Sequence, residues 1–403
     1  MKRLSLIALV AAFVVSAFAF LASSAFAIPV FARKYNTQCN MCHLVPPRLN
    51  KFGVAFKENG FELPPGTVLP ESEVFGNQVL SNDEPKAIVG AGFPFMIRTG
   101  LIVDLTGNTT AGGATTGNNA FLGAALGEFG VIGGGAVETP FGGLGFWIDA
   151  PSAVIGAIDF DFNFNPMFKL AVGTDGPKVG YALALTPNYL GGRNPATQQT
   201  TGATAFVWGN GGQPALEVRG TTNPSTGLGL NYAVGMLIPG AVLLAPNTNA
   251  PGGFYGHVSY FIDAINSNIG VGISSENNGV AGNSAGSQML VDFAYGVGDN
   301  LLLTSTYNKV TLPAAAGVTA GTSTMWATQV EYTVSPTLTV GGRYTDTPGA
   351  AAGVRGNIMS IGANYKLLQN VQAWANYSAT NNNGAGIAAA TTSLGQAGID
   401  FVF

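Results

Sequence analysis

A five-residue motif near the N-terminus carries the clearest chemical signal in the chain. Cys39, Cys42 and His43 form the pattern C-x-x-C-H, in which two thiols bond a c-type haem covalently and the histidine binds its iron. A Cys39–Cys42 disulfide or a thioredoxin-like pair would use the same 2 cysteines. Neither needs the adjacent histidine, and no βαβ pattern surrounds the motif. The motif therefore predicts one covalently attached haem c with His43 as the proximal iron ligand.

Residues 1–27 have the three parts of an export signal. A basic n-region is followed by an apolar stretch from 4 to 21 and by a small-x-small cleavage site at 25–27. We expect the mature protein to begin at Ile28, with retention of the apolar stretch as an anchor as the alternative. No later stretch reaches the roughly 18 apolar residues that a membrane helix needs.

The rest of the chain has the composition and periodicity of membrane strands. Charged residues are 9% of the chain, against about 25% in an ordinary soluble domain. From about residue 90 onward, segments of about 9 to 12 residues alternate apolar and polar positions between turn-forming clusters. In the segment 157–165, aromatic residues fall on one face and acids or amides on the other. A soluble sandwich would bury the aromatic face, whereas a membrane barrel would turn it toward lipid.

Three observations favour the barrel. The side of the first segment that would face a lumen is mixed and partly polar, with Met96, Arg98, Ile102 and Asp104. Short turns near 298–300, 335–336 and 368–370 alternate with longer loops near 276–286, 311–322, 347–355 and 379–391. The chain ends on an alternating segment with Ile399, Phe401 and Phe403 on one face, which resembles the recognition signal of outer-membrane barrels.

These patterns define the predicted fold class and domains. It is a mainly β protein, an outer-membrane antiparallel β-barrel over 91–403, with a small haem-binding α/coil segment over 28–90 that plugs the lumen. About 310 residues at roughly 20 per strand give about 16 strands, with 14 or 18 as alternatives. Strand counts from the two ends disagree in parity across 188–205.

The segment 28–90 is too short to have a core of its own. Leu49, Phe52 and Phe56 have helical spacing, with Gly60 as the C-cap, and this helix would cover one face of the haem. We expect the segment to fold around the haem, in or against the barrel lumen.

Other residues are weaker candidates for binding roles. Met96 and His257, both on the side of their alternating segments that we expect to face the lumen, are candidates for the sixth haem ligand, with an ordinary strand position or an open, water-filled sixth site as alternatives. Asp104, Asp159 and Asp161 could line a path for Fe(II), although any porin lumen is polar. Basic residues of the haem segment could pair with haem propionates. The sequence contains nothing that resembles a hydrolase triad, a phosphate-binding loop or a nucleic-acid surface.

The stretch 27–60 resembles the N-terminal signature of the monohaem cytochrome-porin fusions of iron-oxidising bacteria. The matching residues are Ala27-Ile28-Pro29-Val30-Phe31-Ala32-Arg33, Cys39-x-x-Cys42-His43, Pro47-Arg48-Leu49 and Phe52-Gly53-x-x-Phe56-Lys57-x-x-Gly60. The chain departs from the family at Lys34-Tyr35-Asn36, where a smaller turn containing glycine is expected, and this departure bears on the haem environment.

The resemblance implies an outer-membrane iron oxidase. Its haem takes one electron from extracellular Fe(II) and passes it to a periplasmic c-type cytochrome or another carrier. Some relatives come from organisms not known to grow on iron, so another extracellular donor is one alternative. A passive diffusion porin with the haem as a structural plug is the other.

Overall fold

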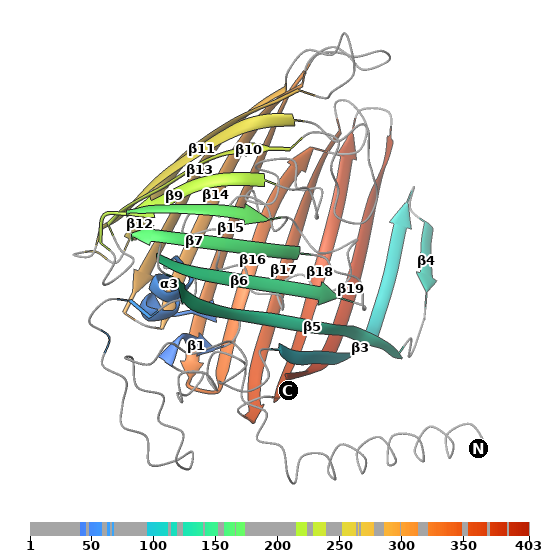
Figure 1. Ribbon diagram of the computed structural model, residues 1–403. Helices are drawn as coiled ribbons and strands as arrows, with labels where there is room; N and C mark the ends of the chain where they lie inside the picture. Colours follow the sequence, from blue (N-terminus) through green and yellow to red (C-terminus); the bar gives the residue numbers. More distant parts are fainter. Residues whose placement is uncertain are drawn as a thin grey trace.

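The structure is a computed structural model in which almost all described residues belong to β-strands (Figure 1). The described residues are 41–45, 48–58, 63–64, 67, 95–111, 114–118, 124–139, 142–151, 157–165, 167–173, 215–223, 229–238, 252–262, 265, 267–277, 286–298, 300–312, 321–348, 354–368, 371–384 and 387–402. The export signal, Cys39, Gly60, the boundary at 90/91 and Phe403 lie outside these ranges.

The strands of the large sheet follow one another along the chain. They are β3 (Phe95–Ala111), β4 (Ala114–Asn118), β5 (Ala124–Thr139), β6 (Gly142–Pro151), β7 (Ala157–Asn165), β8 (Phe168–Gly173), β9 (Ala215–Thr221), β10 (Leu230–Leu237), β11 (Gly252–Ile262), β12 (Ser267–Asn277), β13 (Gly286–Val297), β14 (Leu301–Leu312), β15 (Gly321–Ser335), β16 (Leu338–Pro348), β17 (Val354–Leu368), β18 (Val371–Gly384) and β19 (Ile387–Val402).

Antiparallel pairing closes this sheet into a barrel, because the last strand, β19, pairs with the first, β3. β4 pairs with the end of β3 that extends past β5. If β4 is left out of the count, the barrel wall of the described residues consists of β3 and of β5 to β19, which are 16 strands. A closed ring leaves no edge of unpaired backbone groups in the hydrocarbon. The predicted barrel of about 16 strands is therefore confirmed, and the ambiguous interval 188–205 lies between β8 and β9, outside the described residues.

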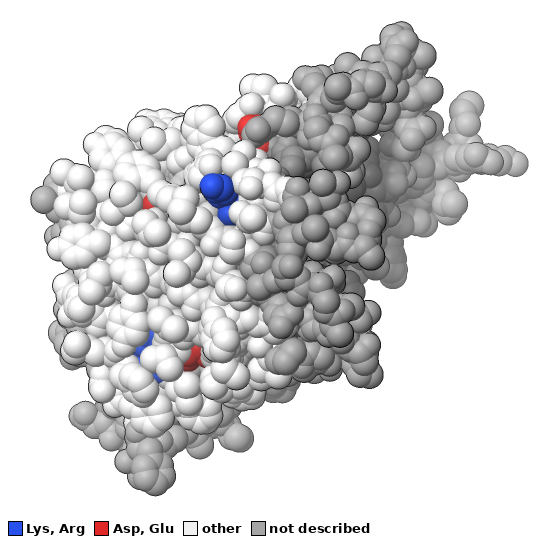
Figure 2. All heavy atoms as spheres, turned by 90° about the horizontal axis from the view of Figure 1, so that it is seen from above, with Lys and Arg blue, Asp and Glu red and all other residues white. Residues whose placement is uncertain are grey.

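Side chains alternate between the two faces of the barrel wall. On β11, Phe254 is 71% exposed and Tyr260 52%, whereas His257 and Ser259, which point to the other face, are 2% and 1% exposed. On β7, the predicted aromatic face is exposed and Asp161 on the opposite face is fully buried. The aromatic face therefore points outward, as expected for a membrane barrel. Few charged side chains interrupt the described outer surface on the side seen in Figure 2.

The connections between strands follow the predicted asymmetry, with one exception. The three predicted short turns lie between β13 and β14, β15 and β16, and β17 and β18, and longer connections alternate with them. The predicted loop at 379–391 is wrong, because β18 continues to Gly384 and β19 begins at Ile387. This stretch has no apolar alternation, but ladder pairing with the neighbouring strands extends it. The side chain of Asn381 on β18 also donates to Asn357 Oδ1 on β17 at 3.1 Å.

The described N-terminal elements are a short hairpin and one helix. β1 (His43–Val45) pairs with β2 (Arg48–Leu49), and α3 (Lys51–Glu58) follows directly. The predicted helix is therefore present, but it begins after Leu49, which belongs to β2. None of the helices in the described ranges is both long and apolar enough to cross a bilayer.

Candidate functional site

Asn50 connects the second half of the haem motif to α3. Its side-chain Oδ1 accepts a hydrogen bond from the Gly53 N–H at 2.8 Å and so caps the helix. Its Nδ2 donates to the Met41 carbonyl at 2.8 Å, and its backbone N–H donates to the Cys42 carbonyl at 2.9 Å. One residue thus fixes the start of the helix relative to Cys42 and His43.

The start of α3 lies against the inner face of the barrel wall. The Lys51 ammonium lies 5.3 Å from the centre of the Phe261 ring. Phe261 is 3% exposed and shares the inner face of β11 with His257 and Ser259. Farther along α3, Phe56 is 5% exposed. The helix α3, which we call the haem-motif helix because it follows the C-x-x-C-H motif, therefore contacts the lumen side of the barrel.

Cys42 and His43 suit a covalently bound haem in their chemistry. A thiol and an imidazole are the groups that attach and ligate a c-type haem, and both residues are half-buried beside the capped helix. Buried apolar side chains on α3, including Phe56 and Ala55, supply the kind of surface that a porphyrin needs.

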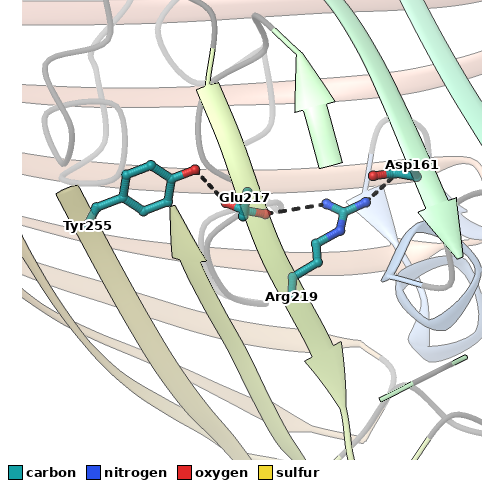
Figure 3. Close-up of polar contacts among 4 residues, drawn as sticks. All are labelled: Asp161, Glu217, Arg219 and Tyr255. Atoms are coloured by element: carbon teal, nitrogen blue, oxygen red, sulfur yellow. Dashed lines mark hydrogen bonds and ion pairs between the residues drawn. The ribbon is translucent and has the colours of Figure 1, made fainter. Parts of the chain in front are cut away.

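A cluster of charged side chains lies on the inner wall across β7, β9 and β11. Figure 3 shows Arg219 between Asp161 and Glu217, with Tyr255 on the far side of Glu217. Arg219 lies 2.5 Å from Asp161 Oδ2 and 3.9 Å from Glu217 Oε1, and the Tyr255 hydroxyl donates to Glu217 Oε2 at 2.8 Å. We call these four residues the Arg219 cluster. Each is at most 3% exposed, so the guanidinium and the two carboxylates interact with one another within the protein rather than with water.

A glycine makes room for the tyrosine of this cluster. Gly235 on β10 pairs with both Tyr255 and Glu217, so it lies directly between them. A Cβ at Gly235 would lie 2.8 Å from Tyr255 Cε1. Only a residue without a side chain lets the tyrosine reach across β10.

His257 is part of a second pair that spans a glycine. Its Nε2 lies 2.6 Å from Asp292 Oδ2, and the two side chains are 2% and 0% exposed. The pair joins β11 to β13 across Gly270 on β12. A Cβ at Gly270 would lie 2.7 Å from both His257 Nε2 and Asp292 Oδ1. His257 therefore faces the lumen as predicted, with one ring nitrogen engaged by a carboxylate.

This barrel matches solved structures of outer-membrane porins and channels. The fold is that of a porin. An anion-selective porin from Comamonas acidovorans aligns with a TM-score of 0.50 and 14% identity, over 76% of this chain and 99% of that one. Salmonella typhi OmpF, in its complex with daunomycin, aligns with a TM-score of 0.54 and 12% identity, over 77% and 97%. The outer membrane channel DcaP of Acinetobacter baumannii gives 0.52 and 12%, over 77% and 96%.

At these identities the likeness concerns the fold, and it supports the predicted outer-membrane location. No family model matches the chain, and no curated protein matches its sequence. The cytochrome-porin resemblance therefore remains a prediction.

The predicted site residues are placed as follows. Cys42 and His43 lie together at β1, whereas Cys39 is outside the described residues. The backbone of Met96 lies in β3, opposite Ile132 of β5, and the sixth ligand stays a prediction. Asp161 belongs to the Arg219 cluster rather than to an open row of acids. Across the described residues, no three His, Cys, Asp or Glu side chains are grouped to hold a metal ion.

Several inner-wall residues were not identified from the sequence. Arg219, Glu217, Tyr255 and Asp292 lie on strands separated by long connections, and their contacts depend on the strand register. One sequence signal could have indicated these contacts. It is a charged or tyrosine side chain at an inward position of one segment, followed by a glycine at the inward position of the next strand, across which that side chain can reach.

Proposed function

We propose that this protein is an outer-membrane cytochrome-porin that oxidises extracellular Fe(II) and passes single electrons to a periplasmic carrier. The observation that carries the proposal is the C-x-x-C-H motif, whose Cys42 and His43 are tied through Asn50 to a helix that contacts the inner wall. A c-type haem held there would supply one-electron chemistry. Each Fe(II) would leave as Fe(III), and its electron would pass to the carrier.

The burial of the inner wall supports this proposal over a passive diffusion porin. Diffusion of solutes requires a hydrated lumen that wets the side chains lining it. Here Lys169, Glu331 and Asn308 on the inner wall are at most 1% exposed. We therefore expect purified protein in a planar bilayer to conduct far less than an open porin. Conductance of porin size would support the diffusion alternative.

The direct test begins with haem content. Full-length protein purified in detergent should contain one covalent haem per chain, measured by the pyridine haemochrome spectrum. Cys42→Ala should lose the covalent attachment. Met41→Ala, a change at a motif position that does not bind haem, should retain it.

Electron transfer is then tested by anaerobic stopped-flow mixing of the oxidised protein with Fe(II). Reduction should proceed to one electron per haem. If dithionite reduces the haem but Fe(II) does not, the electron donor is not iron and the other-donor alternative holds. If no covalent haem is found, the redox proposal fails altogether.

A further inference from the structure

A patch of the inner wall on β11 to β14 is arranged around Gly270. In the strand register, Gly270 pairs with Ser259 on β11 and with Asp292 on β13, and Asp292 pairs with Thr306 on β14. Asn268 lies two residues from Gly270 on the same face of β12. We call Ser259, Asn268, Asp292 and Thr306, with Gly270 between them, the Gly270 patch.

In the part of the chain that the structure describes, the patch contains buried polar atoms with no hydrogen-bond partner. Ser259 Oγ, Asp292 Oδ1, Thr306 Oγ1 and both polar atoms of Asn268 have no hydrogen-bond partner. The four side chains are at most 5% exposed. Buried polar groups in native proteins nearly always have partners, and leaving several unpaired in one place destabilises the fold. An occupant that supplies the missing interactions is therefore expected.

The charge of this surface favours a cation as the occupant. Among the side chains described on the inner face of β11 to β14, Asp292 is the only carboxylate, and there is no Lys or Arg. His257 holds one carboxylate oxygen at 2.6 Å, which leaves Oδ1 as the charged atom without a partner. The Lys51 ammonium lies over Phe261, which pairs with Asn268 at the edge of the patch, and its positive charge weakens the attraction for a second cation.

We propose that the Gly270 patch is a binding site for a divalent cation. Asp292 Oδ1 is the charged ligand, and the oxygens of Asn268 and Ser259 are neutral ligands, because the Asp292 carboxylate lies over Gly270 on their side of β13 and away from Thr306. Carboxylate, amide and hydroxyl oxygens suit hard divalent ions, which keep water in their remaining positions. A single carboxylate implies weak binding, which suits an ion in transit better than a resident metal centre.

This site builds on the proposed function, because it gives Fe(II) a place on the inner wall of the barrel. Binding itself requires neither haem nor electron transfer. The two proposals can therefore fail separately.

The test uses Mn²⁺ as a stable divalent probe, titrated into the detergent-solubilised full-length protein and followed by electron paramagnetic resonance. Wild type should bind about one Mn²⁺ per chain at the site. Asp292→Asn should weaken this binding at least tenfold. Glu331→Gln is the matched control, since it also neutralises a buried inner-wall carboxylate, on β15, and it should bind as wild type does.

Two further variants test the geometry of the site. Gly270→Ala should also weaken Mn²⁺ binding, because the added methyl group displaces the Asp292 carboxylate. His257→Ala should weaken it and His257→Gln should restore part of it, because a side-chain N–H can again hold Asp292. Heat-modifiable migration on gels checks that every variant has formed its barrel.

The proposal is overturned if wild type binds no Mn²⁺ saturably, or if Asp292→Asn and Glu331→Gln bind equally well. The patch would then hold water molecules alone. Haem reduction by Fe(II) is measured on the same samples and tests the proposed function separately from the cation site.

Discussion

The Arg219 cluster and the Gly270 patch are both buried on the inner wall, but they differ in how their polar atoms are satisfied. In the Arg219 cluster a guanidinium lies between two carboxylates, and a tyrosine donates to one of them. In the Gly270 patch, one carboxylate oxygen and the neighbouring amide and hydroxyl groups have no hydrogen-bond partner among the described residues. The first arrangement sets a positive charge against its carboxylates within the protein, whereas the second leaves a carboxylate oxygen for an occupant to bind.

This difference separates structural from functional polar groups on an inner wall where buried polar side chains lie among buried apolar ones. A buried charge is costly unless an opposite charge lies beside it, so the ion pairs of the Arg219 cluster are explained by the need to bury these three charges together. A set of unpaired groups has no such explanation. The same barrel wall can therefore contain both kinds of site on neighbouring strands.

The largest expected effect comes from removing the cation of the Arg219 cluster. Arg219→Met leaves the like charges of Asp161 and Glu217 buried without the guanidinium between them, which should lower the free energy of unfolding by about 3–5 kcal/mol. Arg219→Lys keeps the charge and should recover a large part of this loss. Urea unfolding in detergent micelles measures both. Equal stability of Arg219→Met and Arg219→Lys would mean that the positive charge at position 219 does not stabilise the two buried carboxylates.

The Gly270 patch should not accommodate a larger side chain at position 270. Gly270→Ala places a methyl group against the ends of the His257 and Asp292 side chains, and the shift that this forces breaks their buried hydrogen bond, at a cost of about 1–3 kcal/mol. Gly256→Ala on β11 is the matched control, because its Cβ would meet nothing nearer than the Ala233 carbonyl oxygen at 3.9 Å. The same unfolding measurement should find the control unchanged or slightly more stable. A similar loss for both variants would contradict the role assigned to Gly270.

The barrel itself could be predicted from sequence, because its main signal is local. Alternation with a period of two appears within a single strand, as in 157–165, and closure is expected because an open sheet edge would leave backbone groups unpaired in the hydrocarbon. The loop predicted at 379–391 was wrong because this stretch has no comparable local signal. Its Asn, Thr and Ala residues alternate weakly, and only pairing with β17 and β3 makes them strands.

The contacts of the inner wall could not be predicted in the same way. His257 and Asp292 are 35 residues apart and meet only because two hairpins set the register of three strands. The sequence placed His257 toward the lumen but gave no partner for it. The haem motif is the opposite case: its chemistry is fully local in sequence, so Cys42 and His43 were identified before any fold was considered.

A smaller effect is expected at the tyrosine of the Arg219 cluster. Tyr255→Phe removes the hydroxyl that donates to Glu217, but Arg219 still neutralises the carboxylate, so we expect a loss of about 1 kcal/mol. Tyr260→Phe, on the outward face of the same strand and 52% exposed, should change stability much less. Thermal unfolding followed by circular dichroism compares the two. An equal effect would mean that the buried hydroxyl contributes nothing specific.

The smallest expected effect concerns the contact between the haem-motif helix and the wall. Lys51→Met and Phe261→Leu each remove the cation–π interaction, which at a partly exposed site contributes about 0.5–1 kcal/mol. A double-mutant cycle isolates it, because the double variant should lose less than the sum of the two single losses. The measurement is the urea concentration at which limited proteolysis first cleaves within α3. If the losses of the two single variants are fully additive, the contact between Lys51 and Phe261 does not stabilise the position of the helix. The Asn50 contacts alone would then order the haem motif.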